Sequence, residues 1–235
     1  MTIQEYFQDW SKVVDLPEAD RILRKLSASN TTVCPQIKDI FRAFLLCPFY
    51  SLRVCIIGQD PYPQLRPVCC NSIVTKVPVA TGIAFANSPD TPSDSYSPSL
   101  TILRDSVIDF SRPHNIINFD PSLEKWEKQG VLLLNAALSC QVGKPGSHTL
   151  LWWPFIKSFI TNLSLYHTGI VYVLMGSQAQ CLEPYINARC NHIIRIRHPS
   201  WFVRNKLSMP SGIWQQINDI LIGQNGYGIQ WFEEE

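Results

Sequence analysis

The sequence predicts an α/β protein, a three-layer α/β/α sandwich with a central four-stranded parallel twisted sheet. Four short runs rich in Val, Ile and Leu lack a clean alternation of polar and apolar residues, which is typical of strands buried on both faces. These runs span residues 52–57, 131–134, 170–175 and 192–196. Segments with helical spacing separate the runs, and strands that alternate with helices favour a parallel sheet.

The other elements are predicted in chain order. Residues 1–50 read as helical, with apolar side chains at helical spacing in 19–26 and 37–44, and we assign them to the same domain as the sheet. Further helices are expected at residues 100–110, 121–129, 154–165 and 213–222. The segment 64–80 contains two prolines and predicts an irregular excursion, while 87–98 is dense in residues that favour turns.

Length and composition bound the class of protein. The chain has 235 residues, of which 46% are hydrophobic and 17% charged, so we expect one domain covering 1–235 with a well-formed core. No run of about 18 apolar residues occurs, so a membrane span is not expected. The N-terminus lacks the basic start and apolar stretch of a secretion signal, which predicts an intracellular protein of the cytoplasm or nucleus.

The eight cysteines do not follow a metal-binding pattern. No Cys-x-x-Cys occurs, so the ligand spacing of zinc ribbons and of most iron–sulfur sites is absent, and we expect neither a metal nor a cofactor. A cysteine in an apolar run, such as Cys55, is expected to be a reduced core residue. The adjacent pair Cys69 and Cys70 stays open to redox chemistry.

Positive charge is concentrated in one part of the chain, although the net charge is only +1. Residues 184–218 contain no Asp or Glu, and the basic residues there are Arg189, Arg195, Arg197, Arg204 and Lys206. A local basic face of this kind can hold phosphate even when the whole chain is nearly neutral. A solvated surface with counter-charges elsewhere in the fold is an equally open alternative.

A polar side chain follows each of the four apolar runs: in chain order, Asp60, Asn135, Ser177 and His198. Ligands of open parallel sheets bind beyond the carboxyl ends of the strands. Each residue also has a simpler interpretation, since Asp60 can start a turn, Asn135 can cap a helix and His198 can be a satisfied core histidine. Together they indicate a site at one edge of the sheet.

Five motifs then occur in an order that resembles a known family. They are Gly-Gln-Asp-Pro-Tyr at 58–62, Gly-Ile-Ala-Phe at 82–85, Pro-Ser-Leu at 98–100, Gly-Val-Leu-Leu-Leu-Asn at 130–135 and His-Pro-Ser at 198–200. Together they resemble the highly uracil-selective family 1 uracil-DNA glycosylases. The resemblance implies a monofunctional glycosylase of base excision repair, which hydrolyses the N-glycosidic bond of deoxyuridine in DNA and leaves an abasic site.

The resemblance assigns Gln59, Tyr62, Phe85 and Asn135 to a uracil pocket that receives a nucleotide turned out of the duplex. Phe85 stacks on the base. Asn135 pairs with the uracil edge through its amide donor and acceptor, and so rejects cytosine. Tyr62 stands against C5, where the methyl group of thymine would collide. Ordinary core packing is the alternative for Phe85 and Tyr62.

The resemblance also implies catalytic and DNA-binding roles. Ionised Asp60 would orient the attacking water and stabilise the positive charge on the sugar. Neutral His198 would donate a hydrogen bond to the uracil oxygen as that oxygen gains charge. Ser99, Ser177 and Ser200 match positions that grip phosphate without reading sequence, although turn and helix-cap serines are the alternative.

Three departures from the family pattern concern DNA engagement. Pro63 replaces the usual histidine after the first motif, which removes an imidazole and a backbone donor. The segment 64–80 is longer than usual. In the DNA-intercalating loop, Trp201 and Phe202 stand where the family has proline and the inserted leucine, and we expect both aromatic residues to contact DNA. Val203 lacks the hydroxyl usual there.

These observations predict a monomer that acts on uracil-containing single- or double-stranded DNA. A proteinaceous glycosylase inhibitor and a replication protein are candidate partners. The open alternative is a DNA-binding replication or processivity accessory protein that retains the fold as a scaffold. A hydrolase that uses Asp60, Ser177 and His198 is disfavoured, because no Gly-x-Ser-x-Gly nucleophile elbow occurs.

Overall fold

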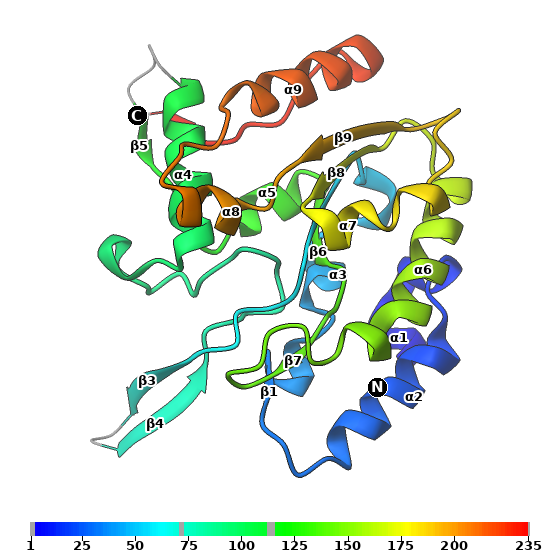
Figure 1. Cartoon of the computed structure of the whole chain (residues 1–235). Helices are drawn as coiled ribbons and strands as arrows, with labels where there is room; N and C mark the ends of the chain where they lie inside the picture. The colour runs from blue at the N-terminus through cyan, green and yellow to red at the C-terminus, as the bar shows by residue number, and fades with distance from the viewer. Residues whose placement is uncertain (1–2, 71–72, 112–115, 235) are drawn as a thin grey trace.

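The computed structural model describes residues 3–70, 73–111 and 116–234 (Figure 1). In this part of the chain the central sheet has four parallel strands in the spatial order β6-β2-β8-β9. They are β2 (Val54–Gly58), β6 (Val131–Asn135), β8 (Val171–Met175) and β9 (His192–Ile196). All four apolar runs are therefore strands, and the predicted fold class is confirmed.

The strands β2, β6 and β8 are buried along their whole length, which explains why their sequences do not alternate. Successive side chains point to opposite faces of the sheet. Cys55 and Leu132 pack into one hydrophobic cluster, and Val54 and Leu133 into another on the opposite face. The central sheet thus separates two cores.

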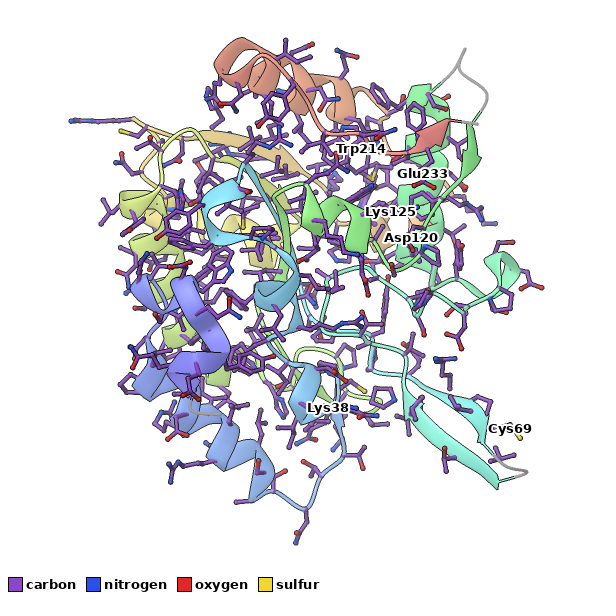
Figure 2. All side chains as sticks on the ribbon, turned by 180° about the vertical axis from the view of Figure 1, so that it is seen from behind. Lys38, Cys69, Asp120, Lys125, Trp214 and Glu233 are labelled. Atoms are coloured by element: carbon purple, nitrogen blue, oxygen red, sulfur yellow. The ribbon has the colours of Figure 1, made fainter. Side chains whose placement is uncertain are left out.

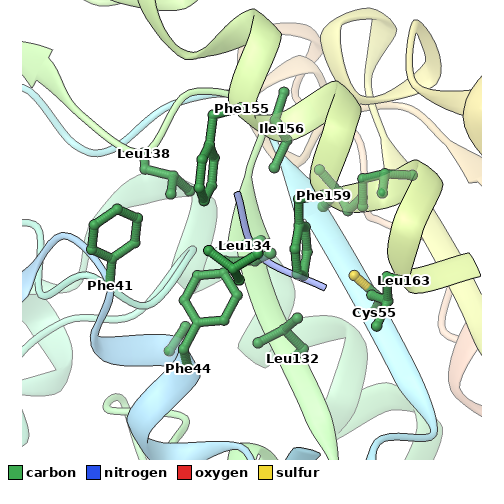
Figure 3. Packing of buried hydrophobic residues seen from close by; sticks show 14 of the residues in the cluster. Phe41, Phe44, Cys55, Leu132, Leu134, Leu138, Phe155, Ile156, Phe159 and Leu163 are labelled. Carbon is green, nitrogen blue, oxygen red and sulfur yellow. The ribbon is translucent and has the colours of Figure 1, made fainter. Parts of the chain in front are cut away.

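Helices from the first half of the chain and α6 cover the first face. They are α1 (Ile3–Phe7), α2 (Leu16–Ser27), α3 (Arg42–Leu46) and α6 (Thr149–Tyr166). Figure 3 shows Phe155 and Phe159 of α6 with Phe44 of α3 over the strand residues Leu132 and Leu134. The structure starts α6 five residues before Pro154, the residue at which the sequence predicted its start. Pro154 is the sixth residue of α6 and lies inside the helix, where it has no amide hydrogen to donate to the carbonyl of Leu150.

The second face is covered by helices from the middle and the end of the chain. They are α4 (Pro98–Ser111), α5 (Glu124–Lys128), α8 (Pro199–Asn205) and α9 (Gly212–Asn225). The indole of Trp126 lies 5.3 Å from that of Trp214 and 5.0 Å from that of Trp231, measured between ring centroids. Lys125 and Glu233 form an ion pair beside this cluster, and both are labelled in Figure 2. The C-terminal segment is therefore docked on the second core.

Several short elements connect these layers. Four of the six other described strands form two small antiparallel pairs, β1 (Val33–Cys34) with β7 (Cys140–Gln141) and β5 (Ile116–Asn118) with β10 (Glu233–Glu234). A further short helix is α7 (Ser177–Gln180), and 3-10 turns occur at Gln8–Lys12, Ile37–Asp39, Phe49–Ser51, Ser93–Ser95 and Glu183–Tyr185. No helix within the described ranges combines the length and the apolar character needed to cross a membrane.

The segment 64–80 is a β-hairpin, so the prediction of an irregular excursion was wrong. Its strands are β3 (Leu65–Cys70) and β4 (Ile73–Pro78), which pair antiparallel with Leu65 opposite Pro78. A proline is compatible with an edge strand, where the missing amide hydrogen can face solvent, and each strand here has a free edge. The hairpin projects away from the body of the molecule (Figure 1). Cys69 lies exposed and free on it (Figure 2), while the side chain of Cys70 lies outside the described part.

Candidate active site

The strand order places the carboxyl ends of β2 and β8 side by side at the point where the chain switches direction across the sheet. Open α/β sheets bind ligands at such a point. A pocket lies at this edge of the sheet, lined by residues that follow β2, β6 and β9, and it brings together many of the predicted site residues. Those that line it are Asp60, Tyr62, Phe85, Ser99, Asn135 and His198, with apolar walls from Ile40, Ile83 and Leu138.

A second, wider cavity adjoins the first at His198. It is lined by four other predicted residues, Gln59, Ser177, Ser200 and Trp201, and by Arg195, Arg197 and Arg204. Much of the basic segment of the sequence therefore faces one cavity beside the pocket. Arg195 forms an ion pair with Glu183. For this residue the structure agrees with the alternative interpretation, a solvated surface whose counter-charges lie elsewhere in the fold.

Gly58 leaves room for the side chains of Asn135 and Phe85 to approach each other in the pocket. A β-carbon added at Gly58 would lie 2.6 Å from Oδ1 of Asn135 and 2.7 Å from Cζ of Phe85. Carbon atoms do not approach other heavy atoms this closely without displacement, so only glycine fits at this end of β2. Asn135 is 9% exposed, and its amide lies beside the Phe85 ring at the end of β6.

Phe85 is held in a conformation that is unusual for its residue type. Its φ of 67° lies in the left-handed region, which costs free energy for a bulky side chain. Two bonds stabilise this segment: the Tyr62 hydroxyl donates to the Phe85 carbonyl at 2.9 Å, and the Ala84 amide donates to the Leu133 carbonyl at 3.2 Å. The ring of Phe85 is thereby placed 5.6 Å from the ring of His198.

Asp60 is half-buried and accepts a hydrogen bond from the Gly146 amide through Oδ2. Burial raises the pKa of Asp60, and the bond from Gly146 opposes that rise because it favours the charged form. The same loop braces the segment after Asp60, since the Gly143 amide donates to the Pro63 carbonyl at 2.8 Å. Sequence reasoning missed Gly146. The two glycines within four residues, Gly143 and Gly146, were the available signal, and the structure gives both a positive φ.

His198 is arranged to be neutral. The Ser200 amide donates to Nδ1 at 3.2 Å, so Nδ1 must carry a lone pair, and we assign the ring hydrogen to Nε2. Burial, with a contribution from the positive charge of Arg204, lowers the pKa of His198 to about 4. Gly176 permits this placement, because a β-carbon there would lie 2.8 Å from Cβ of His198.

The two aromatic residues expected to contact DNA differ in exposure. Trp201 is half-buried and carries the guanidinium of Arg197 on its ring, 4.4 Å from the centroid. Phe202 is only 6% exposed and packs in the second core, so the expectation that it projects toward DNA is not met in this structure. The segment that matches the DNA-intercalating loop forms α8, and the helix turns Phe202 inward.

The two remaining predicted residues, Ser99 and Ser177, lie at the starts of helices. Ser99 is 6% exposed near the start of α4, and Ser177 is the first residue of α7 after Gly176. Across the described ranges, no three His, Cys, Asp or Glu side chains gather in a way that could hold a metal ion.

Comparison with known proteins identifies the family. The family model of the uracil DNA glycosylase superfamily matches residues 44–221. Uracil-DNA glycosylases from Yersinia pestis (strain Pestoides F) and Yersinia pseudotuberculosis (serotype O:1b) are each 33% identical over 208 residues, covering 86% of this chain and 82% of theirs.

Solved structures share the fold. The crystal structure of mimivirus uracil-DNA glycosylase has a TM-score of 0.72 at 21% identity, with 97% of this chain and 92% of that chain covered. A mimivirus UNG variant in complex with UGI has a TM-score of 0.77 at 24% identity, with 97% and 86% covered. The chain therefore belongs to the uracil-DNA glycosylase superfamily, and it is a uracil-DNA glycosylase, a hydrolase that acts on N-glycosyl bonds.

Proposed function

We propose that this enzyme is a monofunctional glycosylase that hydrolyses the bond between uracil and deoxyribose in DNA and leaves the DNA backbone intact. The observation that carries the proposal is the convergence of the Asn135 amide, the Phe85 ring and a neutral His198 on one pocket that also contains Asp60. This set combines base recognition with groups that stabilise both charges of a breaking glycosidic bond.

The pocket suits a pyrimidine that has been turned out of the base stack. Phe85 offers a flat apolar face, and the adjacent Asn135 amide offers one donor and one acceptor to the edge of the base. Uracil presents a matching pattern, whereas cytosine presents a donor where uracil has an acceptor. Tyr62 is held by its bond to Phe85 and forms the wall against C5, which excludes the methyl group of thymine.

The proposed reaction adds a water oxygen to C1′ as the bond from C1′ to the base nitrogen breaks. Positive charge then grows on the sugar, and negative charge grows on the departing uracil. The ionised carboxylate of Asp60 stabilises the sugar and accepts the water proton. The Nε2–H of His198 donates to the uracil oxygen, and a fixed donor of this type is worth about 3–4 kcal/mol. Uracil leaves as the anion and takes its proton from solvent.

The second cavity is the proposed path of the DNA strand beside the flipped nucleotide. Arg197, Arg204 and Ser177 line it and carry groups that bind phosphate without reading sequence. Trp201 lies at the same cavity and offers an aromatic face to a neighbouring base. Because Phe202 is buried, we propose that Trp201 takes the part expected of Phe202 in contacting the opened base stack.

A direct assay tests the proposal. The protein is incubated with single- and double-stranded oligonucleotides that contain one uracil, and alkali is then added to cleave abasic sites. We expect strand cleavage only after alkali, in uracil-containing DNA and not in matched DNA with thymine or cytosine. Asp60→Asn should lose at least about a hundredfold in rate. Asn135→Asp should lose rate on uracil and gain measurable activity on cytosine.

The same assay distinguishes the alternative. Tight binding to uracil-free DNA by a folded protein that never produces alkali-labile sites would replace the glycosylase proposal with the accessory-protein one. A further partner is proposed from one neighbour in fold, which was solved in complex with UGI. If UGI binds this enzyme at the pocket mouth, stoichiometric UGI will abolish cleavage of every uracil substrate.

A further inference from the structure

A chain of hydrogen bonds leads from the outside of α8 into the pocket. Arg204 Nη1 lies 3.2 Å from the hydroxyl oxygen of Ser200, and that oxygen lies 2.9 Å from Nδ1 of His198. The Ser200 amide nitrogen lies 3.2 Å from the same Nδ1. Ser200 and Arg204 are four residues apart on one helix, so their side chains share a face.

The direction of each bond in this chain can be assigned. A backbone amide only donates, so the contact from Ser200 N–H requires a lone pair on Nδ1. With Nδ1 as acceptor, the Ser200 hydroxyl must donate to it. The hydroxyl oxygen then offers its lone pairs outward, and a guanidinium, which only donates, occupies that side. One arrangement of hydrogens satisfies all three contacts, and it places the imidazole hydrogen on Nε2.

The positive charges beside His198 favour its neutral form, whereas an ionised Asp60 in the same pocket opposes them. Asp60 and Tyr62 face it across the pocket, while Arg195, Arg197 and Arg204 line the cavity on its other side. Glu183 neutralises Arg195, whereas Arg197 stacks on Trp201 and Arg204 bonds to Ser200. A positive charge beside the ring disfavours a second proton on it, and the partial burial of His198 has the same effect.

We propose that Arg204 is a positioning residue that orients the Ser200 hydroxyl toward His198 and thereby holds the catalytic imidazole as the neutral Nε2–H tautomer. The role of this arrangement in catalysis rests on the proposed glycosylase function. The hydrogen bonds between Arg204, Ser200 and His198 do not depend on that function. It also gives Ser200 a role other than the phosphate contact expected from the sequence, because its hydroxyl hydrogen is engaged by His198.

The first test uses the DNA-free protein and needs no activity. Nitrogen-15 NMR of the histidine side chains reports the tautomer and the pKa of His198, with His198→Gln used to assign its signals. Wild type should show the Nε2–H tautomer at neutral pH. Arg204→Gln should raise the pKa of His198 by roughly half a unit, since solvent partly screens an exposed guanidinium. Arg204→Lys retains the charge and should stay near wild type.

Two further measurements separate the two ways in which Arg204 can act on His198, through its positive charge and through its hydrogen bond to Ser200. Ser200→Ala keeps the backbone amide but removes the hydroxyl, so it should weaken the preference for the Nε2–H tautomer and admit a minor fraction of the other. High salt should reduce the difference between wild type and Arg204→Gln, because the charge effect is screened while the hydrogen bond is not.

The kinetic test follows single-turnover uracil excision against pH. The acid limb of Arg204→Gln should move to higher pH by the same amount as the NMR titration. A residue that only binds phosphate would instead weaken DNA binding and leave both the tautomer and the acid limb where they are in wild type, which would overturn the proposal. An unchanged His198 titration in folded Arg204→Gln would overturn it as well. If the NMR results appear as expected but no uracil is released, the glycosylase function fails while the positioning role stands.

Discussion

Gly58 and Asn135 are register partners at the ends of β2 and β6, and the Asn135 amide oxygen occupies space that any β-carbon at position 58 would need. The separation would be 2.6 Å, and Phe85 approaches the same point from the other side. The size of the base pocket therefore depends on one missing methyl group.

Gly58→Ala should displace the Asn135 amide or the Phe85 ring and reduce uracil excision by roughly a hundredfold, as expected for a misplacement of about 1 Å at a reacting centre. Gly223→Ala is the matched control. A β-carbon there meets nothing within 4 Å among the described residues, and alanine suits the interior of α9. Single-turnover kinetics measure both variants. Equal rates for Gly58→Ala and wild type would show that the pocket does not need this close approach.

The pH dependence should reflect two groups that must both be unprotonated. Burial lowers the pKa of His198 to about 4 and raises the pKa of Asp60 above its ordinary value. The rate constant for excision should fall as the pH drops toward the pKa of His198, and protonation of Asp60 should add to that fall. In His198→Gln the remaining acid limb reports Asp60 alone. Loss of half the activity near pH 6.5, the ordinary value for histidine, would contradict a neutral, buried His198.

Trp201 and Phe202 are adjacent, but their replacement should have different effects. Phe202→Ala removes a buried ring from the second core and should lower the free energy of unfolding by about 3–5 kcal/mol. Trp201→Ala should leave most of the stability intact and weaken binding to DNA, because its ring lines the outer cavity. Urea unfolding and fluorescence anisotropy with labelled DNA measure the two effects. The assignment of Trp201 would be wrong if Trp201→Ala bound DNA as wild type does.

Glu127, a buried glutamate of α5, provides a test of how stability depends on pH. Its Oε1 accepts the Leu133 amide at 3.1 Å, whereas Oε2 has no hydrogen-bond partner in the described part of the chain. Burial raises the pKa of Glu127 well above its usual range, so the folded protein keeps this proton and the unfolded chain releases it above a pH of about 4. The stability linked to this proton is therefore present at low pH and lost as the pH rises.

Glu127→Gln keeps the acceptor for Leu133 and removes the titration. At pH 7.5 it should stabilise the protein by roughly 1–2 kcal/mol, and the gain should disappear near pH 4.5. The exposed Asp219→Asn serves as the control and should change little at either pH. Urea unfolding at the two pH values measures the difference. A gain of the same size at both would mean that the proton of Glu127 is not the cause.

The location of the site could be predicted from the sequence because several of its polar residues follow strands, whereas its chemistry came from the resemblance to a known family. Asp60, Asn135 and His198 come directly after or at the end of apolar runs, and parallel strands bring their carboxyl ends to one edge. The same local signals predicted four of the longer helices to within a few residues. The hairpin of 65–78 was missed because its prolines argue against a strand, and only its position outside the central sheet makes them acceptable.

The sequence by itself determined the fold class and the edge of the sheet at which Asp60, Asn135 and His198 lie, since both depend on short-range patterns of apolar runs and the polar residues that end them. Tertiary structure decided how those groups act. Trp201 and Phe202 look equivalent in the sequence, but the packing of α8 buries only Phe202. The neutral state of His198 depends on burial and on contacts with Ser200 and Arg204. The contacts with Ser200 and Arg204 are local to α8, but burial is a property of the assembled chain, and no local pattern of residues specifies it.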